Sequence, residues 1–388
     1  MFLSSHEKLS LLGASITTSE IKQQPDLWDE TFSLYLKQYS EIQEFFNKLS
    51  EKHDRIRVIF TGAGTSAYVG ETVLPYLKEK VDERQWELLS VATTTLVSNP
   101  HQFLKADFPT VLVSFARSGN SPESIAAVQL AKDIVEELYQ LTITCAKNGL
   151  LAERALGDTS NLLLLMPERA NDQGFAMTGS YTCMTLAALL VFDPLSNEEK
   201  EGIVQIVRRM GESVLEREAI IKRMIDLDFE RIVYLGSGSL ESLTREVQLK
   251  VLELTAGKIT TVFDSPLGFR HGPKSFINEK TLVFVFVSNQ PYTRKYDIDL
   301  LDELRLDNLA NNICAIAVNN ELNYQGETFS FDHEASFAPD AYLSLPFAMV
   351  GQIIALLSSI KVGNTPDTPS PTGTVNRVVK GVTIYEFK

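Results

Sequence analysis

The sequence contains little cysteine and none of the patterns on which cysteine-dependent folds rely. Its 388 residues include three cysteines, Cys145, Cys183 and Cys314, and no C-x-x-C pair. Disulfide frameworks and zinc clusters need closely spaced cysteines, so neither is indicated. The composition fits a reducing compartment, and we expect the protein to be cytoplasmic.

Positive charge and long apolar runs are also scarce. Lys and Arg total 36 against 50 Asp and Glu, which gives a formal net charge of −14. Nucleic acids and anionic membranes are bound by basic surfaces, so we expect neither as a partner. Residues 1–13 lack the features of a signal peptide, and the apolar run at 186–192 is too short to span a bilayer.

Two common nucleotide-binding motifs are absent or incomplete. The G-x-x-x-x-G-K-[ST] loop is absent, so nothing supports ATP or GTP as a ligand. Residues 62–67 fit the loose G-x-G-x-x-G/A dinucleotide fingerprint, but the strand expected at 87–92 runs into three threonines. The fingerprint requires an acidic residue there to bind the ribose, so the fit is weak.

Two expected strands end in loops rich in glycine and hydroxyl side chains. Residues 58–60 lead into Thr61-Gly62-Ala63-Gly64-Thr65-Ser66, and residues 111–115 lead into Ala116-Arg117-Ser118-Gly119-Asn120-Ser121. In an open parallel sheet such turns lie at one edge, where backbone N–H groups and helix N-termini bind anions. Hydroxyls around backbone amides suit a phosphomonoester on a small molecule. The alternative is two capped helix starts that bind no ligand.

The length favours two domains, and the first half has an α/β pattern. Residues 18–49 have helical spacing and predict an N-terminal helical arm, 1–50. From 55 to 194, strands expected at 56–60, 88–93, 110–115, 140–144 and 162–165 alternate with helices expected at 67–80, 125–138 and 178–192. This alternation predicts a parallel sheet covered on both faces.

The first strand and loop recur in the second half. After a helical stretch at 198–225, residues 232–239 form a strand followed by Gly-Ser-Gly-Ser, and Gly236 lies 174 residues after Gly62. A strand at 281–287 then breaks at 288–293, and a helix is expected from 298, but this copy lacks the Ser-Gly and has the bulky Tyr292. We interpret the chain as two homologous lobes, 51–197 and 213–363, with one intact phosphate loop. The alternative is the general tendency of α/β proteins to repeat βα units.

A helix expected at 240–256 carries an apolar and a polar stripe. The apolar stripe consists of Leu243, Val247, Val251 and Leu254. The polar stripe consists of Glu246, Lys250 and Glu253, at spacings of four and three. Taken alone, Glu246 and Lys250 are most simply a surface pair.

The loop at 264–274 places His271 among turn-forming residues just before the next expected strand. Loops at strand ends carry function more often than packing, and Glu253 on the preceding helix is a candidate acid/base partner. A glutamate and a histidine near a phosphate site suit proton transfer on a sugar phosphate.

Downstream, the Pro- and Gly-rich stretch 363–373 predicts an extended strap, and 378–384 predicts a last short strand containing Lys380. The alternative there is a disordered terminus.

Together these features resemble the double sugar isomerase (SIS) architecture of the glucosamine-6-phosphate synthase isomerase domain, which implies two flavodoxin-like α/β lobes. The resemblance covers nearly the whole chain and is closest to the galactosamine-6-phosphate deaminase/isomerase (AgaS) group. It is carried by the residues at 61–66, 117–124, 246–253, 265–274 and 363–377.

The resemblance implies roles for individual residues. Those implied to bind the substrate and its phosphate are Gly64, Thr65, Ser66, Arg117, Ser118 and Ser121. The implied catalytic residues are Glu253, which would move a proton between C2 and C1, His271, which would assist ring opening, and Lys250 and Lys380, which would contact the sugar. Some residues depart from the synthase: Arg117 stands where it has glutamine, Ala116 where it has serine, and Asn376-Arg377 inverts its Arg-Asn.

The implied activity is deaminating aldose–ketose isomerisation of galactosamine 6-phosphate to tagatose 6-phosphate and ammonia, without metal or organic cofactor. No glutamine-hydrolysing domain precedes the lobes, so we expect ammonia as a product. The implied assembly is a homo-oligomer, at least a dimer, in which His271 reaches the neighbouring subunit and the tail 364–388 completes the active site. The alternatives are plain isomerisation of a hexose 6-phosphate and a sugar-phosphate sensor without catalysis.

Overall fold

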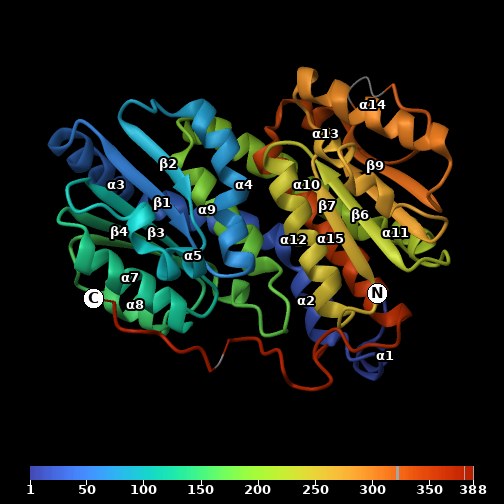
Figure 1. Cartoon of the computed structure of the whole chain (residues 1–388), viewed down its shortest axis with the longest axis horizontal. Coiled ribbons are helices and arrows are strands. Elements are labelled where there is room, and N and C mark those ends of the chain that lie inside the picture. The colour runs from blue at the N-terminus through green and yellow to red at the C-terminus, as the bar shows by residue number, and fades with distance from the viewer. Residues whose placement is uncertain (320–322, 380, 388) are drawn as a thin grey trace. The chain divides into compact units, whose positions relative to one another are not determined.

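Residues 1–319, 323–379 and 381–387 are described by a computed structural model, and within them the chain forms two five-stranded parallel sheets with helices packed on them (Figure 1). Neighbouring strands follow the order β2-β1-β3-β4-β5 in one sheet and β10-β9-β8-β6-β7 in the other. Numbered within each sheet, both orders read 2-1-3-4-5, which is the flavodoxin-like arrangement. The predicted α/β fold with two such lobes is confirmed.

The chain divides into two compact units, which we call the first and second lobes. The first lobe consists of Leu27–Asp172, Gly179–Ser196 and Val375–Lys388, and the second of Met1–Asp26, Gln173–Thr178 and Asn197–Thr374. This division cuts the predicted arm 1–50 after Asp26 and the predicted tail 364–388 after Thr374. The predicted domain boundaries otherwise stay a prediction.

The first lobe contains the sheet β1–β5. Its strands are β1 (Ile56–Thr61), β2 (Trp86–Ser90), β3 (Thr110–Ala116), β4 (Leu138–Thr144) and β5 (Asn161–Leu165). Its helices are most of α3 (Gln24–Lys52), α4 (Thr65–Lys80), α5 (Thr93–Ser98), α6 (Pro100–Phe103), α7 (Pro122–Ile134), α8 (Leu150–Ala155), the 3₁₀ turn η1 (Glu168–Ala170) and α9 (Gly179–Phe192).

Helices cover both faces of this sheet. The rings of Phe60 on β1 and Phe192 on α9 meet edge to face with centroids 5.1 Å apart. The preceding residue, Ile59, packs in a buried cluster with Ala127 and Val128 of α7. Side chains alternate along a strand, so α9 and α7 lie on opposite faces and leave the strand ends for binding.

The second lobe contains the sheet β6–β10. Its strands are β6 (Arg231–Gly236), β7 (Thr260–Asp264), β8 (Thr281–Phe286), β9 (Asn312–Val318) and β10 (Glu327–Phe331). Its helices are α1 (His6–Leu11), α2 (Ser15–Lys22), α10 (Asn197–Glu216), α11 (Glu218–Ile225), α12 (Ser239–Leu254), α13 (Pro266–Phe269), α14 (Pro291–Asp307) and α15 (Asp340–Lys361), with 3₁₀ turns η2 (Pro273–Phe276) and η3 (His333–Phe337).

This sheet is covered in the same way. Phe286 of β8 stacks on Phe347 of α15 with ring centroids 5.7 Å apart. The preceding residue, Val285, clusters with Leu300 and Leu301 of α14. Helix α12 packs on α15 at Gly351, where a Cβ atom would clash with a valine of α12. Helices α15 and α14 therefore lie on opposite faces, and α12 lies beside α15.

The two lobes repeat one unusual loop. Gly64 has φ 57° and ψ −131°, and Gly238 has φ 59° and ψ −124°. This region of backbone space is essentially restricted to glycine. A Cβ atom on Gly62 or Gly236 would lie within 2.5 Å or 2.6 Å of the backbone four residues later. The same constraints at the same place support the interpretation of two homologous lobes.

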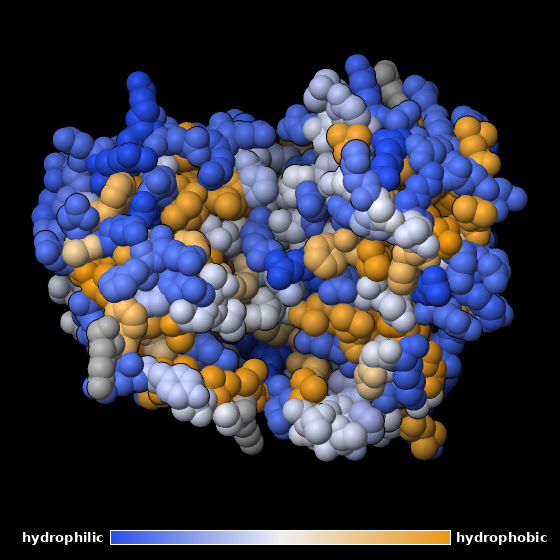
Figure 2. All heavy atoms as spheres, in the orientation of Figure 1, coloured by the Kyte–Doolittle hydropathy of each residue, from blue (hydrophilic) through white to orange (hydrophobic). Residues whose placement is uncertain are grey.

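Among the described residues one helix, α15, is long and apolar enough to cross a membrane, with a mean hydropathy of 1.8. However, 94% of that apolar window is buried inside the protein, so α15 is the core helix of the second lobe. The surface drawn in Figure 2 is mostly hydrophilic, with apolar residues scattered over it.

The three cysteines are buried and unpaired, and burial raises the pKa of Cys183 and Cys314 to about 12.

Several local predictions were wrong. The strand expected at 88–93 ends at Ser90, because the amide of Thr93 donates to the carbonyl of Gly62 at 2.8 Å and the chain turns into α5. The helix expected from 298 begins at Pro291. The helix expected at 125–138 is α7, which begins at Pro122 and ends at Ile134. The described part of 378–384 forms no strand. Strands β7, β9 and β10 were not predicted.

Candidate active site

In the first lobe, the candidate site residues lie at the carboxyl ends of β1 and β3. The two strands pair in parallel with Thr61 opposite Ser114, so the loops that follow leave the sheet at one edge. These loops run directly into α4, which begins at Thr65, and α7, which begins at Pro122. The first turn of a helix has N–H groups without intrahelical partners and a partial positive charge. Two helix starts at one edge suit an anion.

Hydroxyl side chains line the second of these loops. The hydroxyl of Ser121 donates to the hydroxyl of Ser124 at 2.6 Å, and the amide of Asn120 donates to the hydroxyl of Ser118 at 3.3 Å. The side-chain oxygen of Asn120 accepts the amide of Leu150 at 2.9 Å. Local bonds therefore fix the loop while its serines remain partly exposed. In the first loop, Thr65 and Ser66 are 4% and 5% exposed.

Arg117 connects this loop to the C-terminal segment of the same lobe. Its side chain follows β3, is 7% exposed and donates from Nη2 to the carbonyl of Arg377 at 2.6 Å. Arg377 in turn donates from Nε to the carbonyl of Asp172 at 2.9 Å, and Nη2 donates to the same carbonyl. Two arginines thus bind the tail to the loop that is predicted to hold phosphate.

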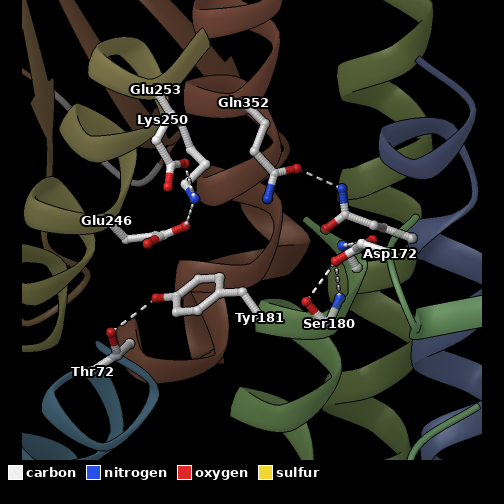
Figure 3. A network of polar contacts seen from close by, with 10 residues as sticks. Thr72, Asp172, Ser180, Tyr181, Glu246, Lys250, Glu253 and Gln352 are labelled. Atoms are coloured by element: carbon white, nitrogen blue, oxygen red, sulfur yellow. Dashed lines mark hydrogen bonds and ion pairs between the residues drawn. The ribbon is translucent and has the colours of Figure 1, made fainter. Parts of the chain in front are cut away.

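Asp172 is itself a structural anchor. Its buried carboxylate accepts the amide of Gly179 at 3.1 Å, the amide of Ser180 at 2.9 Å and the hydroxyl of Ser180 at 2.5 Å, as Figure 3 shows for Ser180. It therefore caps α9 from seven residues upstream. The tail is fastened to the same residue that fixes the start of a core helix.

In the second lobe, the candidate site residues lie on α12. Lys250 Nζ lies 3.3 Å from Glu246 Oε1 and 2.6 Å from Glu253 Oε2 (Figure 3). The side chains of Lys250 and Glu246 are each 1% exposed, whereas that of Glu253 is 22% exposed. The interpretation of Glu246 and Lys250 as a surface pair was therefore wrong. Glu253 is the carboxylate of this triad that solvent reaches.

Electrostatics keeps the ammonium group of Lys250 charged. Burial alone would lower the pKa of Lys250, but the carboxylates of Glu246 and Glu253 outweigh it and raise that pKa above its ordinary value. The ammonium group thus stays protonated between two glutamates. A buried charged group is retained only when it is paired, and this arrangement leaves one carboxylate positioned to accept a proton.

Comparison with known proteins places the chain in a family, although no family model matches it. It is 43% identical over 381 residues to a D-galactosamine-6-phosphate deaminase AgaS of Escherichia coli, covering 96% of each chain. It is 39% identical over 388 residues to the protein of that name from Shewanella sp. (strain ANA-3), covering 99% of this chain and 95% of the other. The chain belongs to the D-galactosamine-6-phosphate deaminase AgaS family.

A solved structure supports the same placement of this AgaS family member. The tagatose-6-phosphate ketose/aldose isomerase of Escherichia coli is 39% identical, with a TM-score of 0.85, and the match covers 96% of this chain and 97% of that chain. The SIS-type architecture implied by the sequence is confirmed. The roles of individual site residues stay a prediction.

Two of the predicted catalytic residues are not joined to the others in the described part of the chain. The side chain of His271 is exposed, and no hydrogen bond or ion pair joins it to Glu253 within the described residues. Lys380 lies outside the described residues. The expected pairing of His271 with Glu253 stays a prediction that involves the neighbouring subunit.

Sequence reasoning missed Asp172 and the role of Arg377. Asp172 caps α9 across the six residues 173–178, and no spacing rule reaches that far. Arg377 lies in a segment without periodicity, and its contacts are with backbone carbonyls. The inverted Asn-Arg pair was the one available signal in this AgaS sequence, because it changes which side chain occupies this place.

Proposed function

We propose that this protein is a deaminating aldose–ketose isomerase that converts galactosamine 6-phosphate and water into tagatose 6-phosphate and ammonia. The observation that carries the proposal is 43% identity along 96% of the chain to a protein named for galactosamine-6-phosphate deamination. The serine-rich loop and the buried glutamate–lysine triad supply the two functions that this chemistry needs. They are an anion site for phosphate and a base for proton transfer.

The first chemical step is a proton transfer along the open-chain substrate. His271 assists opening of the pyranose ring, which exposes the aldehyde at C1. Glu253 then takes the proton from C2, and the electron pair of that C–H bond forms a double bond between C1 and C2. The C1=O π bond breaks at the same time, and O1 takes up a proton to become a hydroxyl. Return of the proton to C1 leaves a C=N bond at C2. Lys250 keeps Glu253 in place through their 2.6 Å ion pair.

The second chemical step releases ammonia. Water adds to C2, the C2–N bond breaks, and the ketone of tagatose 6-phosphate forms. The C1 carbonyl accepts the electron pair in the first step and the protonated C=N bond accepts water in the second, so the mechanism includes no metal and no organic cofactor. Hydrolysis of the C–N bond makes the enzyme a hydrolase in outcome and an isomerase in its proton transfer.

Substrate binding is assigned to the first lobe. The phosphate is held by the hydroxyls of Ser66, Ser118 and Ser121 and by backbone N–H groups at the starts of α4 and α7. Arg117 supports the phosphate with its positive charge while one of its N–H groups holds the carbonyl of Arg377. Gly64 and Thr65 form the turn that brings the backbone close to the ligand.

The assembly and location of the protein are part of the same proposal. We propose a homo-oligomer, at least a dimer, in which His271 acts in the active site of the neighbouring subunit and the tail residue Lys380 contacts the sugar. The exposed side chain of His271 suits such a role. The protein acts in the cytoplasm, where sugar phosphates are metabolised.

A second candidate function is plain ketose–aldose isomerisation of a hexose 6-phosphate. It is favoured by the printed name of the solved relative, a tagatose-6-phosphate ketose/aldose isomerase. A third, a sugar-phosphate sensor, would need the serine loop but would have no use for a charged triad in the interior of α12. The costly burial of Glu246 and Lys250 therefore argues for catalysis.

The experiment that tests the proposal measures ammonium release from a small panel of sugars. Galactosamine 6-phosphate, glucosamine 6-phosphate and unphosphorylated galactosamine are each incubated with the enzyme at matched concentrations. We expect the fastest release from galactosamine 6-phosphate and none from the unphosphorylated sugar. Ketose formation without ammonium would support plain isomerisation, and no turnover of any sugar would support the sensor.

A further inference from the structure

The second lobe has its own counterpart of the phosphate loop. In the first lobe the loop after β3 ends at Pro122, the first residue of α7, and in the second lobe the loop after β8 ends at Pro291, the first residue of α14. Helix α14 has 17 residues and has the same relation to its sheet as α7. An anion site is therefore expected at the carboxyl end of β8 as well.

This position already contains an anion from the chain itself. Asp340, the first residue of α15, accepts the amide of Asn289 at 2.7 Å and the hydroxyl of Ser288 at 2.5 Å. These two donors belong to the loop between β8 and α14. A backbone amide and a serine hydroxyl are the kinds of group proposed to hold phosphate in the first lobe.

A second carboxylate approaches the same loop from α14. Asp297 is fully buried and accepts the amide of Ser288 at 2.9 Å and the hydroxyl of Ser237 at 2.7 Å. Ser237 lies in the glycine loop after β6, the counterpart of the loop that contains Gly64. Both loops that would form an anion site in this lobe therefore give donors to internal carboxylates.

The charges complete the comparison. When both are ionised, the two carboxylates carry the −2 charge of a phosphomonoester that has lost its second proton. Arg294 lies beside them, donating from Nε to the carbonyl of Ser288 at 2.7 Å and from Nη2 to the side-chain oxygen of Asn289 at 2.8 Å. Its side chain is 8% exposed. The arrangement has the donors, the cation and the anionic charge of an occupied phosphate site.

We propose that Asp340 and Asp297 occupy the anion-binding position of the second lobe as an internal substitute for phosphate, so that only the first lobe binds a sugar phosphate. The internal occupation stands on the contacts of the second lobe alone. The count of one external site also rests on the function proposed for the first lobe.

Calorimetric titration with inorganic phosphate tests this inference on the full-length chain. Three variants are compared with the natural protein: Asp340→Ala, which removes the carboxylate bound by the Ser288 hydroxyl and the Asn289 amide; Asp340→Asn, which keeps its shape; and Asp302→Ala, a control on α14 whose side chain is 41% exposed. We expect one phosphate bound per chain in the natural protein, Asp340→Asn and Asp302→Ala. We expect two in Asp340→Ala, because the donors of Ser288 and Asn289 become available.

The outcomes separate the two claims. A folded Asp340→Ala chain with no additional phosphate would overturn the inference, as would two phosphates on the natural protein. If the natural protein binds none and Asp340→Ala binds one, the inference stands and the phosphate loop of the proposed function fails. If Asp340→Ala is too unstable to purify, it is refolded in phosphate and in chloride of equal ionic strength. Phosphate should then raise the yield, and equal yields would contradict the inference.

Discussion

Glu253 differs from the other two members of its triad in exposure, at 22% against 1% for Glu246 and Lys250. A base must reach its substrate, whereas its supporting charges gain from burial because a low dielectric strengthens the ion pair. We therefore assign proton transfer to Glu253 and its positioning to Lys250.

Glu253→Gln should abolish turnover, with a fall in kcat of roughly 10²–10⁴, while sugar-phosphate binding stays nearly intact. The amide keeps the shape of the carboxylate but cannot take a proton. Ammonium release and calorimetric affinity check the two halves of this prediction. Glu241→Gln, at the exposed start of the same helix, is the matched control. Activity of Glu253→Gln within about tenfold of the natural enzyme would refute the assignment.

Ser118→Ala and Ser121→Ala should each weaken binding of the sugar phosphate by about 1–3 kcal/mol, the cost of losing a hydrogen bond to a charged group. Titration calorimetry measures the effect, with the exposed Ser98→Ala on α5 as a control. Unchanged affinity in both variants would move the phosphate to another place in the protein.

Arg377→Ala should raise KM more than it lowers kcat, because Arg377 acts through Arg117 and the phosphate loop. We expect roughly tenfold weaker sugar-phosphate binding, within the usual range for coupled sites. Arg377→Lys should restore part of it, since a lysine reaches the carbonyl of Asp172 with one donor group. The control is Arg154→Ala on α8. An equal fall in stability with no change in KM would show that Arg377 is only structural.

Much of the residue-scale account was available from the sequence. The hydroxyl loops and the Glu246–Lys250–Glu253 spacing were readable, because strand ends and helix periodicity fix where such side chains point. The burial of the Glu246 and Lys250 side chains could not be predicted from the sequence, because it depends on how α12 packs against α15. Contacts to backbone carbonyls, such as those of Arg377, leave no pattern in a sequence.

At the scale of elements, the loops after β6 and β8 both donate hydrogen bonds to the carboxyl group of Asp297 on α14. Burial raises the pKa of Asp297 to about 6, against the opposing effect of its bonds from Ser237 and the amide of Ser288. The other charges facing it are Asp340 on α15, which raises the pKa further, and Arg294 on α14, which lowers it. Because the folded-state pKa exceeds the ordinary 3.8, this group favours folding at low pH.

The stability difference between the natural protein and Asp297→Asn should therefore depend on pH. Between about pH 4 and pH 6 the folded state binds more protons than the unfolded state, so the contribution of Asp297 falls as pH rises. The free energy of unfolding of the natural protein should drop by about 3 kcal/mol relative to the variant across this range. Urea unfolding at a series of pH values measures it, and parallel pH curves would contradict the raised pKa.

Element boundaries show where prediction from sequence succeeded and failed. The central strands β1, β3, β6 and β8 were found because they are buried on both faces and form continuous apolar runs. Helix α14 was placed too late, because its start is signalled by Pro291 and its apolar spacing begins further on. The threonine run at 93–95 has strand propensity, but its bond to the carbonyl of Gly62 begins a helix.

At the scale of the whole molecule, the proposed dimer can be tested by mixing subunits. Ser118→Asp disables the phosphate loop by like-charge repulsion, and His271→Ala removes the residue proposed to act in the neighbouring subunit. A mixed dimer then contains one site with both defects and one with neither, so activity should reappear on coexpression. Each variant expressed alone is the control. A demonstrably mixed oligomer without activity would show that His271 acts within its own chain.

The fold was predictable at this scale because two βα repeats with glycine-rich loops leave few topologies. The way the chain is shared between the lobes was not predictable. The N-terminal residues 1–26 belong to the second lobe, which is built mainly from the second half of the sequence. The C-terminal residues Val375–Lys388 belong to the first lobe, which is built mainly from the first half. Such long-range docking rests on side-chain contacts that have no local sequence signal.

The central claim is that one enzyme both isomerises the sugar and releases its nitrogen. The most direct test is to convert galactosamine 6-phosphate in D₂O and to quantify ammonium and ketose in the same sample, with NMR of C1 in the product. We predict equal amounts of ammonium and tagatose 6-phosphate, with solvent deuterium at C1 in part of the ketose. Ketose without ammonium, or ammonium without ketose, would contradict the account.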